Sequence, residues 1–275
     1  MLDRWNKPEG VVAAGGILDR IVAAKAIRLK MAKLLNPIDS TAKVRTQARG
    51  SGFSFVERIS TEGATNIIAE LKRRSPSKGV IREEYDPRLI AATYERGGAA
   101  ALSVLTEEDF FGGSLDHLRS LNQVKLPLLR KDFIFDEYQV YEAAFAGADA
   151  VLLIVAILDD EMLSRLIRLA DELRVAALVE VHTATEMKRA VAAGAVVIGV
   201  NNRDLTTFKV DLETSLRLAS LAPAGTILVS ESGINSAGEI ARLKSAGFSA
   251  FLIGEHFMRA ADPGEALHRL VAESE

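Results

Sequence analysis

The sequence predicts an α/β protein, a (βα)8 barrel preceded by an N-terminal helical extension. From about residue 61 onward, short apolar runs alternate with longer amphipathic runs, as in βα-repeat folds. Most of the apolar runs lack hydrophobic/polar alternation, which is typical of parallel strands covered on both faces. The 275 residues also suit one barrel, since α/β barrels reach about 250 residues as a single unit. We therefore expect an extension over residues 1–60 packed on a barrel over residues 61–275 as one domain. A doubly wound open sheet is the structural alternative.

The extension is expected to contain one amphipathic helix. Its apolar residues recur at steps of three and four, with charged residues between them, which indicates a helix with one apolar face. The helix should end at Asn36-Pro37. After the glycine- and serine-bearing stretch over residues 48–53, the pattern changes to the regular alternation. The recurring apolar residues are Ile17, Ile21, Ala24, Ile27, Met31 and Leu34.

Eight apolar runs are predicted to be strands, because they are short and several are rich in valine and isoleucine. In order, they are Asn66–Leu71, Ala100–Leu105, Leu126–Arg130, Ala150–Val155, Ala176–Val181, Val196–Val200, Ile227–Ser230 and Ala250–Gly254.

A helix is predicted after each strand, over Asp86–Arg96, Leu115–Asn122, Asp136–Ala146, Asp159–Leu173, Thr183–Ala193, Leu212–Leu221, Ser236–Ala246 and Pro263–Ala272. Four glycines, spaced 50, 47 and 53 residues apart, join a helix to the next strand: Gly97, Gly147, Gly194 and Gly247. Each suits the left-handed position that ends a helix, and the spacing equals two βα units. This faint repeat favours the barrel.

The composition of the chain excludes several classes of function. A net charge of −3 gives no overall positive field for a nucleic-acid backbone, and the absence of cysteine excludes disulfides, thiol nucleophiles and cysteine-bound metals. The longest candidate membrane span, Ala143–Leu158, is interrupted by Gly147 and Asp149 and is too short. The apolar run Val11–Leu18 is too short and too glycine-rich for a signal segment. We expect a cytoplasmic protein that binds neither nucleic acid nor a membrane.

Ionisable residues close five of the eight predicted strands. In (βα)8 barrels the carboxyl ends of the strands form the active-site rim, and burying part of a charge there is costly unless the charge is paired. Glu70 and Lys72 end the first strand two residues apart and should project to the same side. The other strand ends carry Arg130–Asp132, Glu180–His182, Asn201–Asp204 and Glu231–Gly233. The sequence therefore predicts an active site on this rim.

The loops after the seventh and eighth strands are candidates for phosphate binding, since barrels commonly hold phosphate there. Gly233 and Gly254 would let the backbone approach an anion, whereas the Glu255 carboxylate should point away from it. The loop over Arg73–Gly79, after the first strand, could close over an anionic substrate as a lid, or could simply be a solvated basic loop.

Six segments resemble the sequence signature of indole-3-glycerol phosphate synthases. They occur in the family's order: Ile67–Ser77, Ser103–Glu107, Arg130–Ile134, Leu178–His182, Gly199–Leu205 and Val229–Ile234. The resemblance covers most of the chain. It implies closure of 1-(2-carboxyphenylamino)-1-deoxyribulose 5-phosphate to an indole, with loss of carbon dioxide and water, in tryptophan biosynthesis.

The resemblance also implies roles for individual residues. Lys131 would be the general acid and Glu180 the general base, while Glu70 and Lys72 would position the substrate and transfer protons. Whether Lys72 or Lys131 acts as the acid in dehydration stays open. The remaining assignments are Asn201 at the substrate hydroxyls, Arg203 near the phosphate, Glu231 in the charged network, Ser232, Gly233, Gly254 and the Glu255 backbone around the phosphate, Phe111 and Phe133 as apolar walls, and Ser75 at the substrate carboxylate.

No cofactor or metal is expected, since the four histidines lack ligand spacing. The expected partners are a small phosphorylated substrate and other enzymes of the tryptophan pathway. Among rivals, phosphoribosylanthranilate isomerase needs a cysteine that this chain lacks, and the tryptophan synthase α subunit lacks the Glu-x-Lys and Arg-Lys-Asp-Phe strand ends. A non-catalytic barrel that binds a phosphorylated ligand is the alternative from another class.

Overall fold

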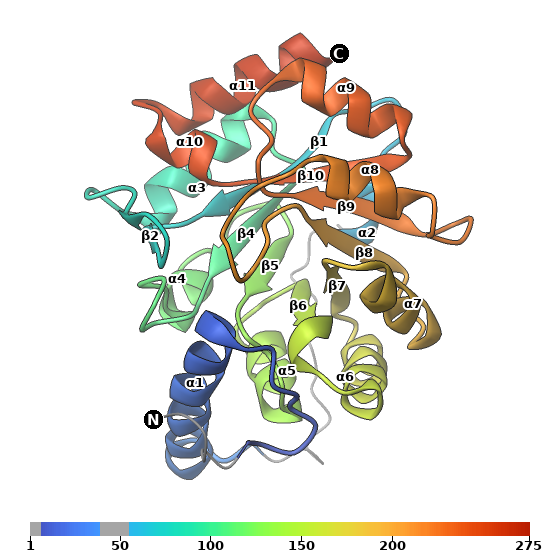
Figure 1. The fold of residues 1–275 in the computed structure, drawn as a ribbon. Coiled ribbons are helices and arrows are strands. Elements are labelled where there is room, and N and C mark those ends of the chain that lie inside the picture. Colours follow the sequence, from blue (N-terminus) through green and yellow to red (C-terminus); the bar gives the residue numbers. More distant parts are fainter. Residues whose placement is uncertain (1–6, 39–54) are drawn as a thin grey trace.

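The computed structural model describes residues 7–38 and 55–275, and its centre is a closed barrel of parallel strands. The strands are β1 (Asn66–Leu71), β4 (Ala101–Leu105), β5 (Leu128–Lys131), β6 (Ala150–Ile154), β7 (Ala176–Val181), β8 (Val197–Asn201), β9 (Ile227–Glu231) and β10 (Phe248–Ile253). Neighbours in the chain pair with each other, and β1 pairs with both β4 and β10, which closes the ring (Figure 1). The predicted (βα)8 TIM barrel is confirmed, and the open-sheet alternative is wrong.

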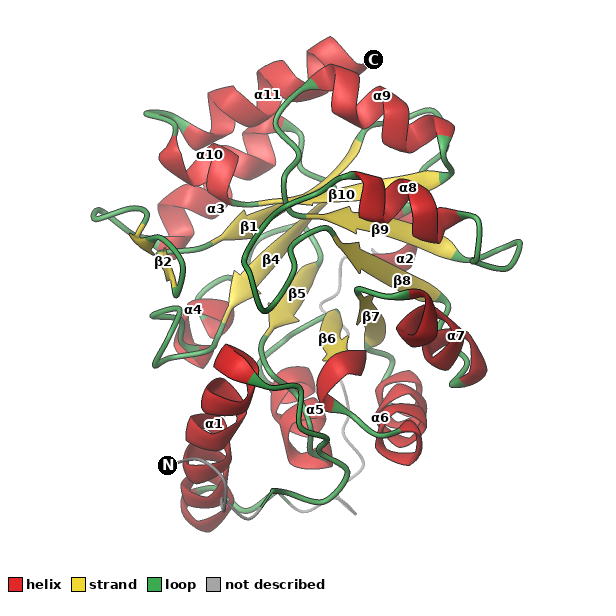
Figure 2. Ribbon diagram, viewed as in Figure 1, coloured by secondary structure: helices red, strands yellow, loops and turns green. Residues whose placement is uncertain are grey.

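Helices surround the strands, as Figure 2 shows. They are α3 (Pro87–Gly97), α4 (Leu115–Arg119), α5 (Glu137–Phe145), α6 (Asp160–Glu172), α7 (Ala184–Ala192), α8 (Glu213–Ala219), α9 (Ala237–Ser245) and α11 (Pro263–Ser274). Most begin after an aspartate, serine or threonine whose side chain accepts a hydrogen bond from a first-turn N–H. Each N-cap thus sets where the chain leaves the rim and turns back along the barrel.

Some predicted boundaries and elements need correction. β5 extends to Lys131, so the expected acid is the last residue of a strand rather than the first of a loop. The last barrel strand begins two residues before the predicted Ala250, and α4 ends three residues before the predicted Asn122. The sequence also missed α2 (Phe55–Ile59), a hairpin of β2 (Arg74–Ser75) and β3 (Gly79–Val80), the short 3-10 helix η1 (Val155–Ile157) and α10 (Glu255–Arg259). These elements are too short to show a clear period.

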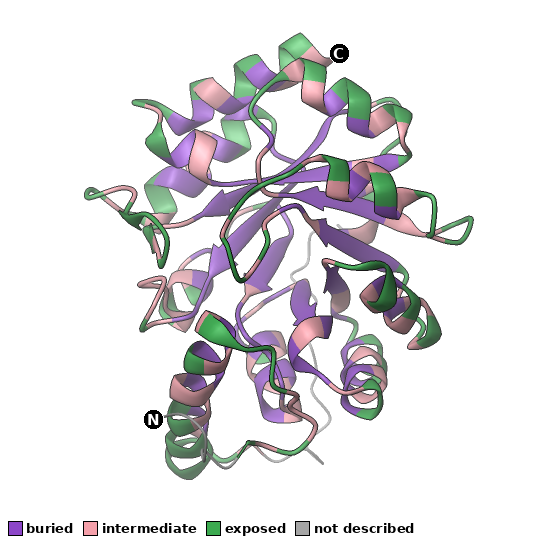
Figure 3. Cartoon of the chain, viewed as in Figure 1, coloured by how far each residue is buried: buried purple, intermediate pink, exposed green. Residues whose placement is uncertain are grey.

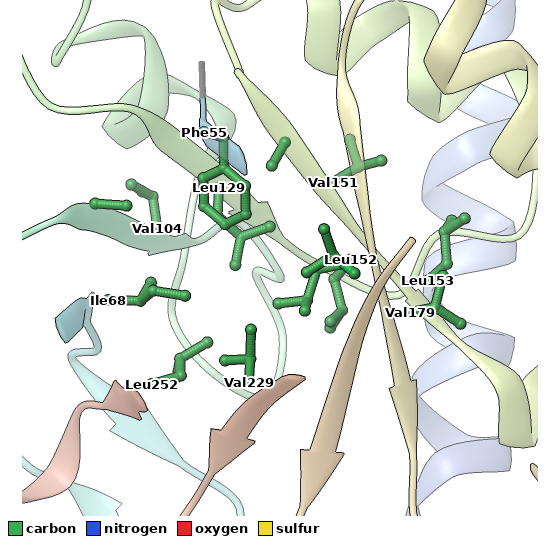
Figure 4. Packing of buried hydrophobic residues seen from close by; sticks show 14 of the residues in the cluster. Phe55, Ile68, Val104, Leu129, Val151, Leu152, Leu153, Val179, Val229 and Leu252 are labelled. Carbon is green, nitrogen blue, oxygen red and sulfur yellow. The ribbon is translucent and has the colours of Figure 1, made fainter. Parts of the chain in front are cut away.

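The core is formed by the barrel strands and the inner faces of the helices, which are buried almost throughout (Figure 3). Ile68, Leu152, Val229 and Leu252 gather in the space that the strands enclose, whereas Leu153 and Val179 lie on the other side of their strands (Figure 4). Side chains alternate between the two faces of a strand, and both faces are covered here. The apolar runs therefore show no polar alternation until they reach the rim.

Helix α1 (Gly16–Leu35) confirms the predicted helix and its end at Asn36, but the predicted apolar face is right only near its start, at Ile17 and Ile21. Its buried residues are Leu18, Ile21, Val22, Lys25 and Leu29. Ile27, Met31 and Leu34 are 70%, 51% and 68% exposed. The cause is Lys25, whose ammonium lies 2.7 Å from Asp132 and turns that side of the helix inward.

The join between the extension and the barrel is described only in part. α1 lies beside α5 (Figure 1), where the Tyr138 hydroxyl donates to the Ala32 and Asn36 carbonyls. The glycine- and serine-bearing stretch over 48–53 lies outside the described residues, so the boundary near residue 60 stays a prediction. No described helix is both long enough and apolar enough to span a membrane.

Candidate active site

A cavity of about 950 Å³ opens at the carboxyl ends of the barrel strands. Every candidate residue from the sequence lines it, although their strands are far apart in the chain. The lining includes Glu70, Lys72, Ser75, Phe111, Lys131, Phe133, Glu180, Asn201, Arg203, Glu231, Ser232, Gly233, Gly254 and Glu255. Parallel strands deliver their carboxyl ends to the same rim, which is why residues from β1 to β10 meet in one cavity.

Lys131 lies at the centre of the charged residues in this cavity. Its ammonium contacts Glu231, at the end of β9, and lies 3.5 Å from Oε2 of Glu180, in β7. Across the cavity, Lys72 Nζ lies 2.5 Å from Oε1 of Glu70, in β1. All three glutamates are buried. The site therefore holds two lysine side chains against three buried glutamates.

The pKa values of Lys131 and Glu70 are both shifted. Burial opposes the charge of Lys131, but the carboxylates of Glu231, Glu180 and Glu70 reverse the effect and raise its pKa. Burial also opposes the charge of Glu70, but Lys72 and Lys131 lower its pKa below the ordinary value. Lys131 is thus held as an ammonium, able to donate a proton only to a strongly basic atom.

Glu180 and Glu231 flank the same ammonium and yet shift in opposite directions. Burial acts to raise the pKa of Glu180, but Lys131, His182 and Asn201 outweigh it and lower the pKa to about 2. Burial raises the pKa of Glu231 to about 7, since Lys131 is opposed there by the charges of Glu180 and Glu70. The difference lies in the additional partners, which Glu180 has and Glu231 lacks.

His182 belongs to the same charged cluster, although the sequence predicted no role for it. Its Nε2 lies 3.3 Å from Glu180 and its Nδ1 lies 3.2 Å from Glu186. Burial opposes its charge, but these two carboxylates raise the pKa of the imidazole to about 10. His182 is therefore a cation at neutral pH, and it holds the carboxylate of Glu180 in its ionised form. Its position two residues after Glu180, directly after an otherwise apolar strand, was the available signal.

The region around the expected phosphate has two cations and one anion. The Glu255 carboxylate lies 3.8 Å from the Arg203 guanidinium and 3.1 Å from that of Arg259. It therefore faces these two cations and partly neutralises them. Its orientation relative to a bound phosphate stays a prediction. Ser232 and Gly233 both have left-handed backbones, with φ of 68° and 82°. A Cβ on Gly233 would overlap Val210, so only glycine fits there.

Part of the cavity lining is apolar. The rings of Phe111 and Phe133 lie 6.1 Å apart in a tilted arrangement. Ile17, Leu18 and Ile21 of α1 also line the cavity, so the N-terminal helix forms part of its wall. This contribution could not be predicted from the sequence, because nothing in the helix pattern shows which strand end the helix covers.

The loop after β1 contains the β2–β3 hairpin, and Ser75 lines the cavity from it. The Arg74 guanidinium donates hydrogen bonds to the carbonyls of Asp109 at 2.5 Å and Phe110 at 3.1 Å. The hairpin is therefore tied to the loop after β4. Closure of this loop as a lid stays a prediction.

A second buried network supports the end of β5. Asp132 accepts hydrogen bonds from Thr106 at 2.6 Å and Arg130 at 3.0 Å, and it forms an ion pair with Lys25 of α1. Its other oxygen accepts a hydrogen bond from the Phe133 N–H. This network fixes the residue between Lys131 and Phe133, both of which line the cavity.

Comparison with known proteins identifies the family. The family model of indole-3-glycerol phosphate synthase matches residues 18–270. The chain belongs to the indole-3-glycerol phosphate synthase family. The curated indole-3-glycerol phosphate synthase of Carboxydothermus hydrogenoformans is 51% identical over 217 residues, covering 78% of this chain and 82% of its own length. That of Albidiferax ferrireducens is 46% identical over 260 residues, covering 93% and 98%.

Among solved structures, 3-hexulose-6-phosphate synthase from Salmonella typhimurium matches with a TM-score of 0.61 at 14% identity. It covers 77% of this chain and 100% of its own. At that identity the match shows the fold alone. The synthase family model begins inside α1, so the helix that lines the cavity is part of what the family shares.

Proposed function

We propose that this protein is an indole-3-glycerol phosphate synthase, which closes 1-(2-carboxyphenylamino)-1-deoxyribulose 5-phosphate to indole-3-glycerol phosphate in tryptophan biosynthesis. Family membership supports the reaction. The observation that carries the proposal is the Lys131 ammonium between the carboxylates of Glu180 and Glu231. The cavity around it is lined by the aromatic rings of Phe111 and Phe133 and by the cations Arg203 and Arg259, which suits an aromatic ring joined to a sugar phosphate.

Lys131 is proposed as the general acid of ring closure. The ring carbon that bears the carboxylate attacks the ribulose carbonyl carbon, and the carbonyl oxygen gains negative charge. This oxygen becomes basic enough to take a proton from Lys131, although the neighbouring carboxylates raise the pKa of that ammonium. The ring carboxylate then leaves as carbon dioxide, and its bonding electrons restore the aromatic ring.

Dehydration completes the indole. The new hydroxyl leaves as water after protonation, and the neighbouring carbon loses a proton to form the pyrrole double bond. Glu180 is proposed as the base for that proton. Glu70 and Lys72 are proposed to position the substrate and to transfer protons, with Asn201 at the substrate hydroxyls and Glu231 holding Lys131. Whether Lys72 or Lys131 protonates the leaving hydroxyl is left open.

Substrate binding is assigned to the two ends of the cavity. We assign the phosphate to Arg203, Ser232, Gly233, Gly254 and the backbone of Glu255. The anthranilate ring is assigned to the space between Phe111 and Phe133, with Ser75 at its carboxylate. The support is that all of these residues line one cavity and that Arg203 lies beside Glu255 in it, 3.8 Å away.

The test follows formation of the indole product by fluorescence, with purified, chelator-treated protein and the carboxyphenylaminodeoxyribulose phosphate. Wild-type protein should form indole-3-glycerol phosphate. Lys131→Met should abolish turnover and leave the fold intact. Lys125→Met is the matched control, since Lys125 is an exposed lysine just before β5, and it should keep full activity.

Each outcome has a meaning. Substantial turnover by Lys131→Met would remove Lys131 as the acid. Glu180→Gln should bind substrate but turn it over slowly, and an unchanged rate would remove Glu180 from the mechanism. A wild-type protein that binds substrate without forming indole would instead support the non-catalytic barrel.

The proposal includes a cytoplasmic location and contact with other tryptophan-pathway enzymes. It is supported by the family's small phosphorylated substrate, which such enzymes exchange. Cell fractionation, followed by crosslinking in the soluble fraction, would test both parts.

A further inference from the structure

Gly199 lies inside the barrel, in β8, between the strands that carry Glu180 and Glu231. Its register partners are Glu180 in β7 and Val229 in β9, and Figure 1 shows β8 between these two strands. A Cβ built on Gly199 would overlap Oε1 of Glu231 and would lie 3.2 Å from Cδ1 of Leu178. The carboxylate of Glu231 therefore occupies the space that a side chain at position 199 would need.

The backbone of Gly199 does not itself require glycine. Gly199 is absent from the glycines with positive φ, so its conformation is open to an L-residue. Glycine inside a strand weakens it, and such a glycine often marks a close approach by another group. The group that approaches Gly199 is the carboxylate of Glu231. A glycine at this position weakens the strand, but it leaves room for that carboxylate.

The position of Glu231 depends on few other contacts. One of its oxygens contacts Lys131, while Oε1 is buried and has no hydrogen-bond partner among the described residues. Because Oε1 is the far end of a flexible side chain, a methyl group at position 199 can displace it without moving the backbone. Lys131 would then keep only Glu180, at 3.5 Å, and would shift toward β7.

We propose that Gly199 is a positioning residue for the reaction. Because it has no side chain, the carboxylate of Glu231 can lie beside it and hold the Lys131 ammonium. The inference rests on the proposed function, because it gives Lys131 the role of acid. It adds a residue whose effect on the reaction passes through Glu231.

The main test compares Gly199→Ala with Gly238→Ala. Gly238 lies in α9 and a Cβ there meets no atom within 4 Å, so its variant should match wild type in activity. Gly199→Ala should lower kcat by about 10- to 100-fold, the effect of misplacing a catalytic group by about 1 Å. It should leave KM within about twofold, because no substrate-binding residue is changed. The protein should still fold, because the displaced oxygen is the far end of a flexible side chain. An unchanged kcat overturns the proposal.

A double-mutant cycle tests whether the effect of Gly199→Ala on kcat depends on Glu231. Glu231→Asp withdraws the carboxylate from position 199, so Gly199→Ala should lower kcat by less than about threefold in that background. An equal loss in both backgrounds means that Gly199 acts without Glu231 and overturns the proposal. Should Gly199→Ala fail to fold, folding of the double variant supports the contact, and its unfolding contradicts it.

A crystal structure of Gly199→Ala provides a readout that does not need turnover. The expected result is that both Glu231 oxygens lie more than about 4 Å from Lys131 Nζ, beyond an ion pair. A retained contact overturns the proposal. A wild-type protein that forms no indole would refute the proposed function, while this structure would still decide whether Gly199 positions Glu231.

Discussion

Replacing Lys25 with methionine removes the charge that α1 places against the end of β5. The Lys25 ammonium lies 2.7 Å from Asp132 and 3.0 Å from Glu108, and its side chain is only 6% exposed. Removing one partner from a buried ion pair costs about 3–5 kcal/mol, since the other charge stays buried. Asp132 keeps Arg130, Thr106 and one backbone N–H, which places the expected loss near the lower end, about 3 kcal/mol.

The assay is unfolding by urea and by heat at pH 7. A loss of about 3 kcal/mol corresponds to a fall in Tm of about 6–12 °C for a domain of this size. Lys33→Met is the matched control on the same helix, because Lys33 pairs with Asp136 at 2.6 Å but is 44% exposed. An exposed pair contributes about 0–1 kcal/mol. If the two variants differ by less than about 1 kcal/mol, the buried network does not stabilise the protein as argued.

The pH dependence gives a second check on the Lys25 variant. Burial acts to raise the pKa of Asp132, but Lys25 and Arg130 reverse this and hold the pKa below its ordinary value. The ionised carboxylate therefore stabilises the fold above the ordinary pKa of about 4, and this stabilisation is lost as pH falls through the folded value. In Lys25→Met, Asp132 should protonate at higher pH. The gap between variant and wild type should thus shrink below about pH 4; a constant gap would contradict the pairing.

Three further outcomes are expected. The pKa of His182 is raised to about 10, so the charged imidazole stabilises the fold fully below about pH 6.5, and this stabilisation is lost as the pH rises toward 10. The urea midpoint should therefore fall over that pH range in wild type but not in His182→Gln. Gly264→Ala should cost about 1–3 kcal/mol in urea unfolding, because a Cβ there would lie 2.5 Å from the Thr93 carbonyl oxygen and force α11 away from α3. Arg203→Ala should raise KM far more than it lowers kcat in the indole assay, whereas the exposed control Arg217→Ala should change neither.

The sequence predicted the barrel and the candidate site because both depend on local patterns. Strands covered on both faces are continuously apolar, so an ionisable residue that ends such a run stands out, as Glu180 and Glu231 do. Parallel pairing then brings the ends of all the strands to one rim. No long-range contact had to be known to place these residues in one cavity.

The buried face of α1 could not be predicted, because it depends on a partner far along the chain. Apolar periodicity favoured a face containing Ile27 and Met31, which the structure leaves exposed. The helix buries Lys25 instead, and only the position of Asp132 in space explains why a lysine is inside. The same limit applies to Gly199, whose sequence position suggests a simple strand residue until the carboxylate beside it is seen.

The opposite pKa shifts of Glu180 and Glu231 bear on the order of the proposed steps. With a pKa of about 2, Glu180 is a weak base while Lys131 is an ammonium. That low value depends on the positive charge 3.5 Å away. When Lys131 gives its proton to the substrate oxygen, this charge disappears and the pKa of Glu180 must rise, since burial then acts with less opposition. The acid step would therefore strengthen the base that the later proton removal requires. Lys131 lies between Glu231, which Gly199 leaves room for, and Glu180, so the geometry that positions the acid also makes the strength of the base depend on it.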